Sequence, residues 1–240
     1  INYPSGEAFA NTNIGFYYFL KNDFIQAYLF QIKALNRIDK VENPELEMLI
    51  HERIGYIYYF SNADAQKIVD HFDLIRSHFD KVGEKSKAAS VLVIQGGGSF
   101  RLGNYSESFN YFNNYLDCTK GIEVPRIEKL IVYYSLGDIY FIRNDLKNAW
   151  KYYKKCLDLQ DVQFIEEYAL MANIYLKIGT YYQYTNKFDS AFFYFNQCLD
   201  LSSQIYYARG MMNANISLGL LFKSTGDDQK SISCFKSAVH

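Results

Sequence analysis

Apolar side chains recur along the chain at the spacing of amphipathic helices, and short polar turns interrupt them at regular intervals. The pattern is clearest in Leu136 to Asp161, LGDIYFIRNDLKNAWKYYKKCLDLQD, which reads as two helices joined by an Asn-Asp turn. The first helix presents Gly137 and Tyr140 on one side, and the second presents Ala149 and Tyr153. Because glycine and alanine let two helices approach closely, this stretch predicts a tight helical hairpin.

The same hairpin recurs six times, at intervals of 40 to 42 residues. A glycine, preceded by Ile or Leu in five of the six copies, marks each first helix: Gly15, Gly55, Gly96, Gly137, Gly179 and Gly219. Seven residues later stands Asn or Gly, the types that tolerate the positive φ of a tight turn: Asn22, Asn62, Gly103, Asn144, Asn186 and Gly226. So regular a period over the whole chain predicts a solenoid.

Two copies depart from the pattern. Twelve residues after the glycine a small residue is expected, and the second copy has Lys67 there. Its second helix still carries an apolar stripe of Ile68, Phe72, Ile75 and Phe79, so it is predicted to be amphipathic. The third copy lacks the Leu before its glycine and the Tyr after it.

These positions together resemble the tetratricopeptide repeat. The shared pattern is Leu-Gly, Tyr three residues after the Gly, Asn or Gly at seven, Ala at twelve, Phe or Tyr at sixteen, and Ala or Cys followed by Leu. The resemblance covers essentially the whole chain and implies an all-α, right-handed superhelical solenoid of about six helix-turn-helix hairpins in a single domain, 1–240. The implied repeats lie near 6–40, 45–80, 85–119, 125–160, 163–202 and 205–240.

The copies are longer than the common repeat of about 34 residues. That length resembles the repeats of bacterial regulators, including peptide-sensing transcription factors and sensor kinases. A chain that begins with Ile and ends inside a helical pattern is expected to be a fragment of a larger protein. Its compartment, cytoplasmic or periplasmic, would then depend on segments outside the fragment.

Charge and hydropathy exclude two classes of partner for this segment. The formal net charge is −1, and no Arg-rich arm or basic stripe stands out, which argues against nucleic-acid binding. No stretch reaches the ~18 consecutive apolar residues of a membrane span. The start INYPSGEAF lacks the basic and apolar regions of a signal peptide.

The four cysteines do not indicate a metal site or a disulfide. Cys156 and Cys198 occupy the same repeat position, where small buried residues are expected, and successive layers hold them too far apart to bridge. Cys118 and Cys234 complete the set, and no C-x2-C pair suggests zinc.

Other candidate chemistry is weak, so no catalytic residue, metal or cofactor is expected. His71 and His78 repeat the triplet HFD two helical turns apart, about 10.5 Å of rise, which favours a solvated helix face over one metal ion. Gly96, Gly97 and Gly98 lack the Gly-Lys-Ser ending of a phosphate loop and fall inside a predicted helix. They indicate either a bend or a place where a ligand approaches the backbone, and no Ser-His-Asp arrangement accompanies them.

The resemblance implies that the first helix of each hairpin lines a concave, peptide- or protein-binding face. Tyr offers rigid contact area and Asn can hold both groups of a peptide bond. Register places these residues on that face: Asn13, Phe16, Arg53, Tyr56, Tyr59, Arg101, Tyr134, Asp138, Asn173, Lys177, Tyr184, Asn213 and Lys223. The family's Lys and Asn clamp for a C-terminal carboxylate is replaced by Thr12 and Phe16, Glu52 and Tyr56, and Val93 and Gly97, which disfavours that ligand.

We therefore expect a protein- or peptide-binding module, the sensory or scaffolding region of a bacterial regulator. Its output domain, a histidine kinase or helix-turn-helix module, would lie outside the fragment. A stand-alone interaction scaffold and a peptide-regulated, phosphatase-like regulator are the alternatives. The last copy carries an apolar stripe of Ile232, Phe235 and Val239 without a polar cap, which predicts further repeats, a linker helix or a homodimer.

Overall fold

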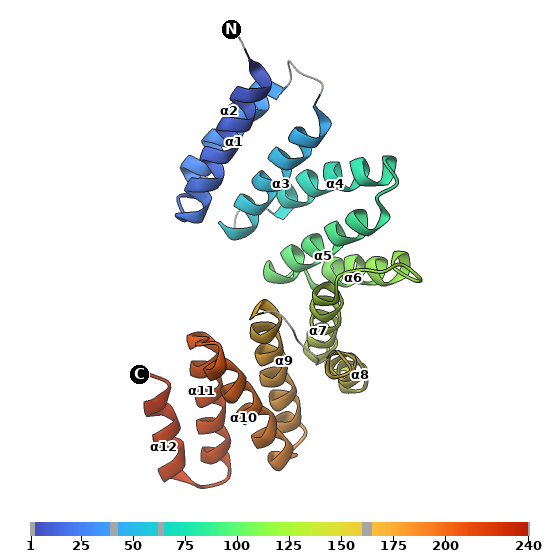
Figure 1. Ribbon diagram of the computed structural model, residues 1–240. Coiled ribbons are helices and arrows are strands. Elements are labelled where there is room, and N and C mark those ends of the chain that lie inside the picture. Colours follow the sequence, from blue (N-terminus) through green and yellow to red (C-terminus); the bar gives the residue numbers. More distant parts are fainter. Residues whose placement is uncertain (1–2, 39–42, 62–64, 160–164, 240) are drawn as a thin grey trace. The chain divides into compact units, whose positions relative to one another are not determined.

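The computed structural model describes residues 3–38, 43–61, 65–159 and 165–239, and all regular structure in these ranges is α-helical (Figure 1). The helices are α1 (Pro4–Leu20), α2 (Phe24–Ile38), α3 (Pro44–Phe60), α4 (Ala65–Lys81), α5 (Lys85–Arg101), α6 (Tyr105–Cys118), α7 (Arg126–Ile142), α8 (Leu146–Leu157), α9 (Ile165–Tyr184), α10 (Phe188–Gln204), α11 (Ala208–Ser224) and α12 (Asp228–Ser237). They pair in chain order as hairpins, which confirms the all-α helical repeat fold.

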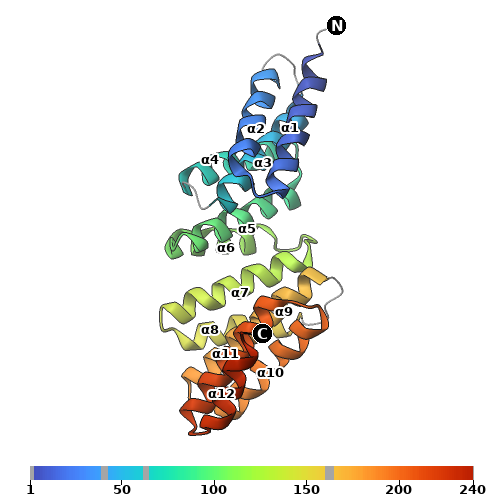
Figure 2. The same cartoon turned by 90° about the vertical axis from the view of Figure 1, so that its left-hand side faces the viewer.

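The chain divides into two compact units of three hairpins each. The first unit is Ile1–Val124, with α1 to α6, and the second is Pro125–His240, with α7 to α12. Figure 2 shows from a second side that the two helices of a hairpin, such as α5 and α6, lie alongside each other. Within the units, α1 also packs on α3, α7 on α9, and α9 on α11. The single domain over 1–240 and the superhelical hand stay predictions.

All six marker glycines stand at equivalent crossings of the two hairpin helices. A Cβ atom at five of them would lie 2.5–2.7 Å from an aromatic ring of the second helix, closer than side chains tolerate. The pairs are Gly55 with Phe72, Gly96 with Phe112, Gly137 with Tyr153, Gly179 with Phe195, and Gly219 with Phe235. In the first copy Gly15 meets the side chain of Gln31 instead. The repeat deduced from the sequence is therefore a repeat of packing.

The small residue twelve positions after the glycine closes the same crossing. In the third copy the Ser108 hydroxyl donates a hydrogen bond to the carbonyl of Gly96 at 2.8 Å, and in the last copy Ser231 donates to Gly219 at 2.8 Å. In the other copies that follow the pattern the residue is a fully buried alanine, as at Ala149. Small size at this position thus lets the second helix lie against the backbone of the first.

The turns inside the hairpins adopt the left-handed conformation that the sequence predicts. Asn22, Asn144 and Asn186 have φ of 58°, 60° and 56°, and Gly103 and Gly226 have φ of 81° and 83°. The chain reverses there because these residues tolerate positive φ at lower cost than others. The sixth predicted turn residue, Asn62, lies outside the described residues.

The second copy corrects the sequence alignment by one residue. Its ring, Phe72, follows Gly55 by seventeen residues, whereas the other copies have sixteen. Ile68 is therefore the buried residue at the crossing, with 3% of its surface exposed, and Lys67 lies on the surface. The alignment that placed Lys67 at the small position was therefore wrong by one residue, because one extra residue separates the glycine from the second helix of this copy.

The cysteine prediction is confirmed for the two equivalent residues. Cys156 and Cys198 are both fully buried and free, as small core residues would be. Burial raises the pKa of both thiols, to about 11 for Cys198, which keeps that thiol protonated at neutral pH. They serve the core and have the chemistry of inert structural cysteines.

Candidate functional site

Arg53 joins the first helices of the first two hairpins. Its guanidinium donates to the Asn13 side-chain oxygen at 3.2 Å and to the Thr12 hydroxyl at 3.2 Å. The same group lies over the ring of Phe16, 4.8 Å from its centroid. Three of the residues expected on the binding face, Asn13, Phe16 and Arg53, are thus brought together across α1 and α3.

Arg101 repeats this arrangement between α3 and α5. Its guanidinium lies 4.4 Å from the centroid of Tyr59 and 5.9 Å from that of Phe60. Phe60 in turn contacts Phe19 of α1 at 5.5 Å between centroids, and Phe19 stacks on Phe16 at 6.1 Å. We call this continuous set the arginine–aromatic surface: Phe16, Phe19, Arg53, Tyr59, Phe60 and Arg101.

The arginine–aromatic surface is open to solvent. Phe16 is 40% exposed and Phe60 is 50% exposed, and Leu20 beside them is 63% exposed. Guanidinium groups that lie over aromatic rings are held in place by that contact and keep their positive charge. Such a surface can cover apolar side chains of a partner and hydrogen-bond its carbonyl or carboxylate oxygens.

Tyr56 lies deeper on the same helix and connects this surface to the interior. Its ring meets Phe72 edge-on at 5.7 Å. Burial raises its pKa to about 12, and the negative charges of Glu52 and Tyr59 act in the same direction. Tyr56 is therefore a neutral phenol at neutral pH, able to donate or accept a hydrogen bond.

The three glycines of α5 have different surroundings. Gly96 is the repeat crossing, whereas a Cβ at Gly97 would lie 3.7 Å from the Tyr59 hydroxyl and one at Gly98 would lie 3.5 Å from Ile68 Cγ2. α5 runs without interruption through all three, so they form a helix and no phosphate loop. There is open space between Gly97 and the Tyr59 hydroxyl. The approach of a ligand to the backbone at this point stays a prediction.

In the second unit, Asp138 lies beneath the surface. It is 3% exposed, accepts a hydrogen bond from the Tyr153 hydroxyl at 2.7 Å and pairs with Lys177 Nζ at 3.1 Å. Burial raises the pKa of Asp138, while Lys177 and the Tyr153 hydrogen bond lower it. We call these three residues the Asp138 network. Asp138 is thus a buried link between α7, α8 and α9, with its own bonding capacity already used.

The other expected residues of the second unit are less closely gathered. Tyr134 neighbours the network, and burial, followed by the charge of Asp138, raises its pKa. Lys177 and Asn213 line a cavity of about 210 Å³ between α9 and α11. Asn173 donates to the Tyr207 hydroxyl at a long 3.5 Å.

Tyr184 and Lys223 lie at the turn ends of their helices. The Tyr184 hydroxyl donates to the side-chain oxygen of Asn144 at 3.2 Å, and its ring meets Phe141 at 5.5 Å. Lys223 is exposed near the end of α11 and is not joined to the other expected residues.

The apolar stripe of the last copy is only partly buried. Phe235 of α12 packs on Gly219, whereas Ile232 of the same helix and Val239 beyond it are exposed, so the homodimer stays a prediction.

The prediction for His71 was wrong. Its Nδ1 lies 2.8 Å from Nδ1 of His51 in α3, and its ring stacks on Tyr58 at 5.8 Å. Burial, followed by the neighbouring His51, lowers the pKa of His71 to about 4. The partner lies on another helix, which periodicity along one helix cannot reveal. His78, the second His of the pair of HFD triplets, lines a separate cavity.

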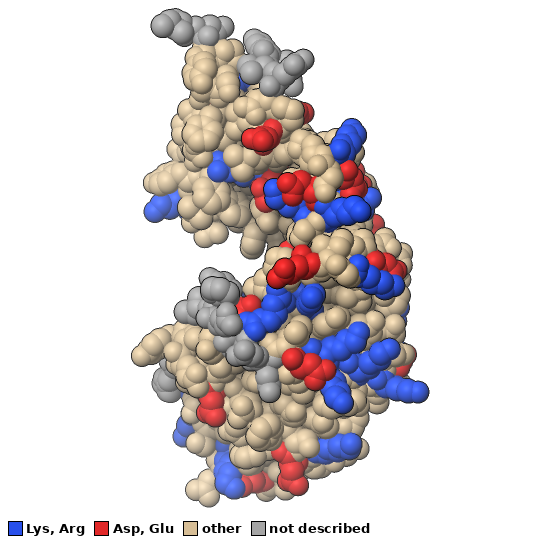
Figure 3. Space-filling view, turned by 45° about the vertical axis from the view of Figure 1, so that its right-hand side comes forward, with Lys and Arg blue, Asp and Glu red and all other residues tan. Residues whose placement is uncertain are grey.

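On the face that Figure 3 displays, Lys and Arg are interspersed with Asp and Glu. In the described part of the chain, no three His, Cys, Asp or Glu side chains gather in a way suited to a metal ion. Among the helices described, none combines the length and apolarity that crossing a bilayer requires.

Sequence reasoning missed Phe60, although its register pointed to it. Phe60 stands five residues after its marker glycine, the same position as Arg101 and Tyr184, both of which were expected on the face. Phe19 is partly exposed and was also missed; its contacts with Phe16 of its own helix and Phe60 of α3 place it on this surface.

Residues 128–204 match the family model described as tetratricopeptide repeat. No curated protein sequence matches the chain. Among solved structures, the apo form of RapI is 14% identical with a TM-score of 0.73, covering 97% of this chain and 96% of that one.

Two further solved structures resemble the chain. The Rap conjugation gene regulator of the plasmid pLS20, solved with the Phr* peptide, is 15% identical with a TM-score of 0.67, over 95% of this chain and 72% of that one. A signal transduction ATPase with a tetratricopeptide repeat sensor, from Pyrococcus horikoshii, is 16% identical with a TM-score of 0.78, over 99% of this chain and 36% of that one. At these identities the likeness shows the fold.

Proposed function

Because the chain is a helical repeat protein of the tetratricopeptide type, we propose that it binds a peptide or an extended protein segment through the arginine–aromatic surface. The single observation that carries this proposal is the continuity of that surface across three first helices. Rings from α1 and α3 and guanidinium groups from α3 and α5 contact one another in sequence. Aromatic and arginine side chains are also the types that contribute most to binding at protein interfaces.

The geometry favours an extended ligand. Arg53 and Arg101 come from successive repeats and place positive charge at separate points, and exposed rings lie between them. An extended peptide presents carbonyl oxygens at regular intervals along its length, and its side chains can cover the rings between those points. Asp138 and Tyr153 are buried in the second unit, so we assign their hydrogen bond to stability.

The finer role that we propose is the sensory region of a regulator. The likeness to a Rap regulator solved with a peptide, and to a signalling ATPase with a repeat sensor, supports this choice. A scaffold that holds a partner protein is the alternative, and a phosphatase-like regulator is a weaker one. The proposal is one of binding and assigns no catalytic step to these residues.

The experiment is a thermal-shift and fluorescence-anisotropy titration with peptides selected on the chain from a random display library. A sensor is expected to gain several degrees in Tm from a short selected peptide, because a ligand stabilises the folded state by RT ln(1 + [L]/Kd). The double variant Arg53→Gln/Arg101→Gln is expected to lose at least about tenfold in affinity while remaining folded.

A matched control is Lys147→Gln/Lys151→Gln, which removes the same charge from the exposed face of α8. Its affinity is expected to equal that of the wild type. Equal loss in both double variants would show that net charge, and not this surface, governs binding. If the selection yields no peptide and only a folded partner protein binds, the scaffold is favoured over the sensor.

A further inference from the structure

One cavity in the first unit lies between α3 and α5, over α4. Its volume is about 980 Å³, at the upper end of the ~300–1,000 Å³ of small-molecule sites. α3 and α5 contact each other near their ends, where the Arg101 guanidinium lies 4.4 Å from the ring centroid of Tyr59. The cavity lies nearer the starts of the two helices, with Met48 on the α3 side and Ile94 on the α5 side.

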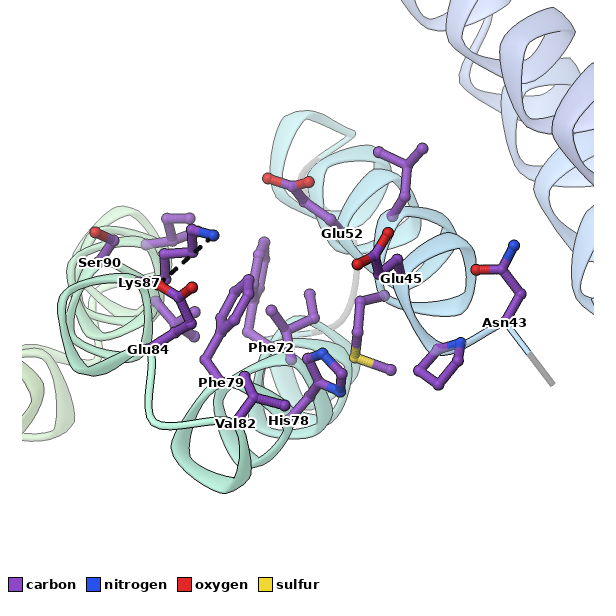
Figure 4. Close-up of a pocket in the computed structure, with 16 residues that line it drawn as sticks. Asn43, Glu45, Glu52, Phe72, His78, Phe79, Val82, Glu84, Lys87 and Ser90 are labelled. Atoms are coloured by element: carbon purple, nitrogen blue, oxygen red, sulfur yellow. Dashed lines mark ion pairs between the residues drawn. The ribbon is translucent and has the colours of Figure 1, made fainter.

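The irregular second copy accounts for this space. Its extra residue places Ile68, a branched side chain, where other copies carry alanine or serine, and its second helix turns large side chains toward the space. Figure 4 shows Phe72 and Phe79 rising from α4 between the two flanking helices. Met48 of α3 and Ile94 of α5 also line the cavity, so its interior is mainly apolar.

The rim of this cavity is acidic. Glu45 and Glu52 reach it from α3 and Glu84 from the start of α5, as Figure 4 shows. The single lysine of the lining, Lys87, pairs with Glu84 at 3.7 Å and lies over Phe79 at 5.6 Å. In the described part of the chain neither Glu45 nor Glu52 makes an ion pair, so two carboxylates remain for a ligand.

Glu52 connects the cavity to the arginine–aromatic surface. It raises the pKa of Tyr56, whose ring contacts Phe72 in the cavity wall. Its neighbour Arg53 turns away toward Asn13 and Phe16 of α1, so that guanidinium does not occupy the cavity. A peptide lying on the open surface can therefore place one or two side chains in the cavity beside Glu52.

We propose that the cavity between α3, α4 and α5 accepts an apolar segment of a peptide that carries an arginine or lysine, with the cationic group paired to Glu52. The apolar interior covers the hydrophobic side chains, and the acidic rim complements the cation. An acidic or carboxylate-bearing segment would meet Glu45, Glu52 and Glu84 and be repelled. This inference rests on the proposed function and adds the chemistry of the ligand.

The test compares three pools of N-acetylated, C-amidated heptapeptides labelled with fluorescein. All share randomised flanks, and their fixed cores are Leu-Arg-Phe, Leu-citrulline-Phe and Leu-Glu-Phe. Citrulline has the shape of arginine without its charge. Fluorescence anisotropy is expected to show the arginine pool binding at least about tenfold more tightly than the citrulline pool, and the glutamate pool most weakly.

Variants locate the effect. Glu52→Gln is expected to bring the preference for arginine over citrulline below about threefold. The control Glu123→Gln, an exposed residue outside the cavity, is expected to keep the full preference. Ser90→Tyr, placed on the α5 wall to fill the space, is expected to weaken all pools, with circular dichroism showing whether the helices persist.

Three results would overturn the inference. They are equal binding of the arginine and citrulline pools, an unchanged preference in Glu52→Gln, and concentration-dependent dimerisation that the arginine pool does not reverse, which would mean that a second copy fills the cavity. If selected peptides still bind and still need Arg53 and Arg101, the inference alone fails and the proposed function stands. Absence of any peptide binding defeats both.

Discussion

The ring of Tyr153 lies flat against the backbone of Gly137, so that a Cβ atom at position 137 would be 2.6 Å from Tyr153 Cε1. The hydroxyl of the same ring donates to Asp138, the next residue of α7, at 2.7 Å. One side chain of α8 is therefore fixed at both its face and its tip by consecutive residues of the facing helix. This pair is the best-defined example of the crossing that all six hairpins share.

Gly137→Ala is expected to destabilise the protein by about 1–3 kcal/mol. The added methyl overpacks the crossing, and the ring of Tyr153 cannot withdraw without losing its bond to Asp138. Urea denaturation followed by circular dichroism measures the loss. A variant as stable as the wild type would show that the crossing is looser than the structure indicates.

Gly97→Ala is the opposite case, with an expected gain of about 0.5–1 kcal/mol in the free energy of unfolding. A Cβ at this position meets only the Tyr59 hydroxyl, at an ordinary 3.7 Å, and alanine has the higher helix propensity. The same denaturation experiment applies. If Gly97→Ala instead loses stability, α5 needs its glycine for a reason other than packing.

Tyr153→Phe is expected to cost about 1–3 kcal/mol, because it removes the hydroxyl that donates to the buried Asp138 carboxylate and leaves only Lys177 bonded to it, while the ring is retained. Tyr152→Phe is the matched control. The Tyr152 ring stacks on Tyr140 at the surface, so loss of its hydroxyl should change stability by less than about 0.5 kcal/mol. Equal effects of the two variants would contradict a role for the Asp138 network.

Stability is expected to fall as the pH is lowered from about 6.5 to about 4, because of His51 and His71. Burial lowers the pKa of both rings, that of His71 to about 4. The unfolded chain therefore binds more protons than the folded one in this window, so the stabilisation present above pH 6.5 is lost as the pH falls. Glu47 and Asp70 oppose the shifts, while Lys67 adds to that of His71.

The 2.8 Å contact between the two Nδ1 atoms allows one proton between them, so a second proton would set two donors against each other. His71→Phe keeps a ring to stack on Tyr58 and is expected to flatten the dependence of Tm on pH. His78→Gln, a histidine outside this pair, serves as the control and should keep the wild-type dependence. A wild-type dependence in His71→Phe would assign the acid sensitivity to other groups.

The repeat could be predicted from sequence because its determinants are local. Gly137 and Ala149 are small where helices cross, and Asn144 tolerates positive φ where the chain reverses. These requirements recur at a fixed spacing, so the six hairpins, their turns and the burial of Cys156 could be anticipated. The alignment of the copies placed Lys67 at the small position of the second copy, where one extra residue shifts the register of the second helix and puts Ile68 at the crossing.

The arginine–aromatic surface is formed by side chains from different helices. Sequence register placed Arg53, Phe16 and Tyr59 on one face, but only the tertiary structure showed the guanidinium groups stacked on rings of the preceding repeat. It also showed that Asp138 is buried and bonded to Lys177, and that the ring of His71 contacts that of His51.

The sequence by itself determined the helices and their pairing into hairpins, because these follow from residue size and backbone conformation within about forty positions. Only the tertiary structure decided which polar groups contact each other and where a cavity lies, here between α3 and α5 beside Phe72. Such contacts depend on the distances between helices, and one inserted residue changes those distances without disturbing the apolar pattern.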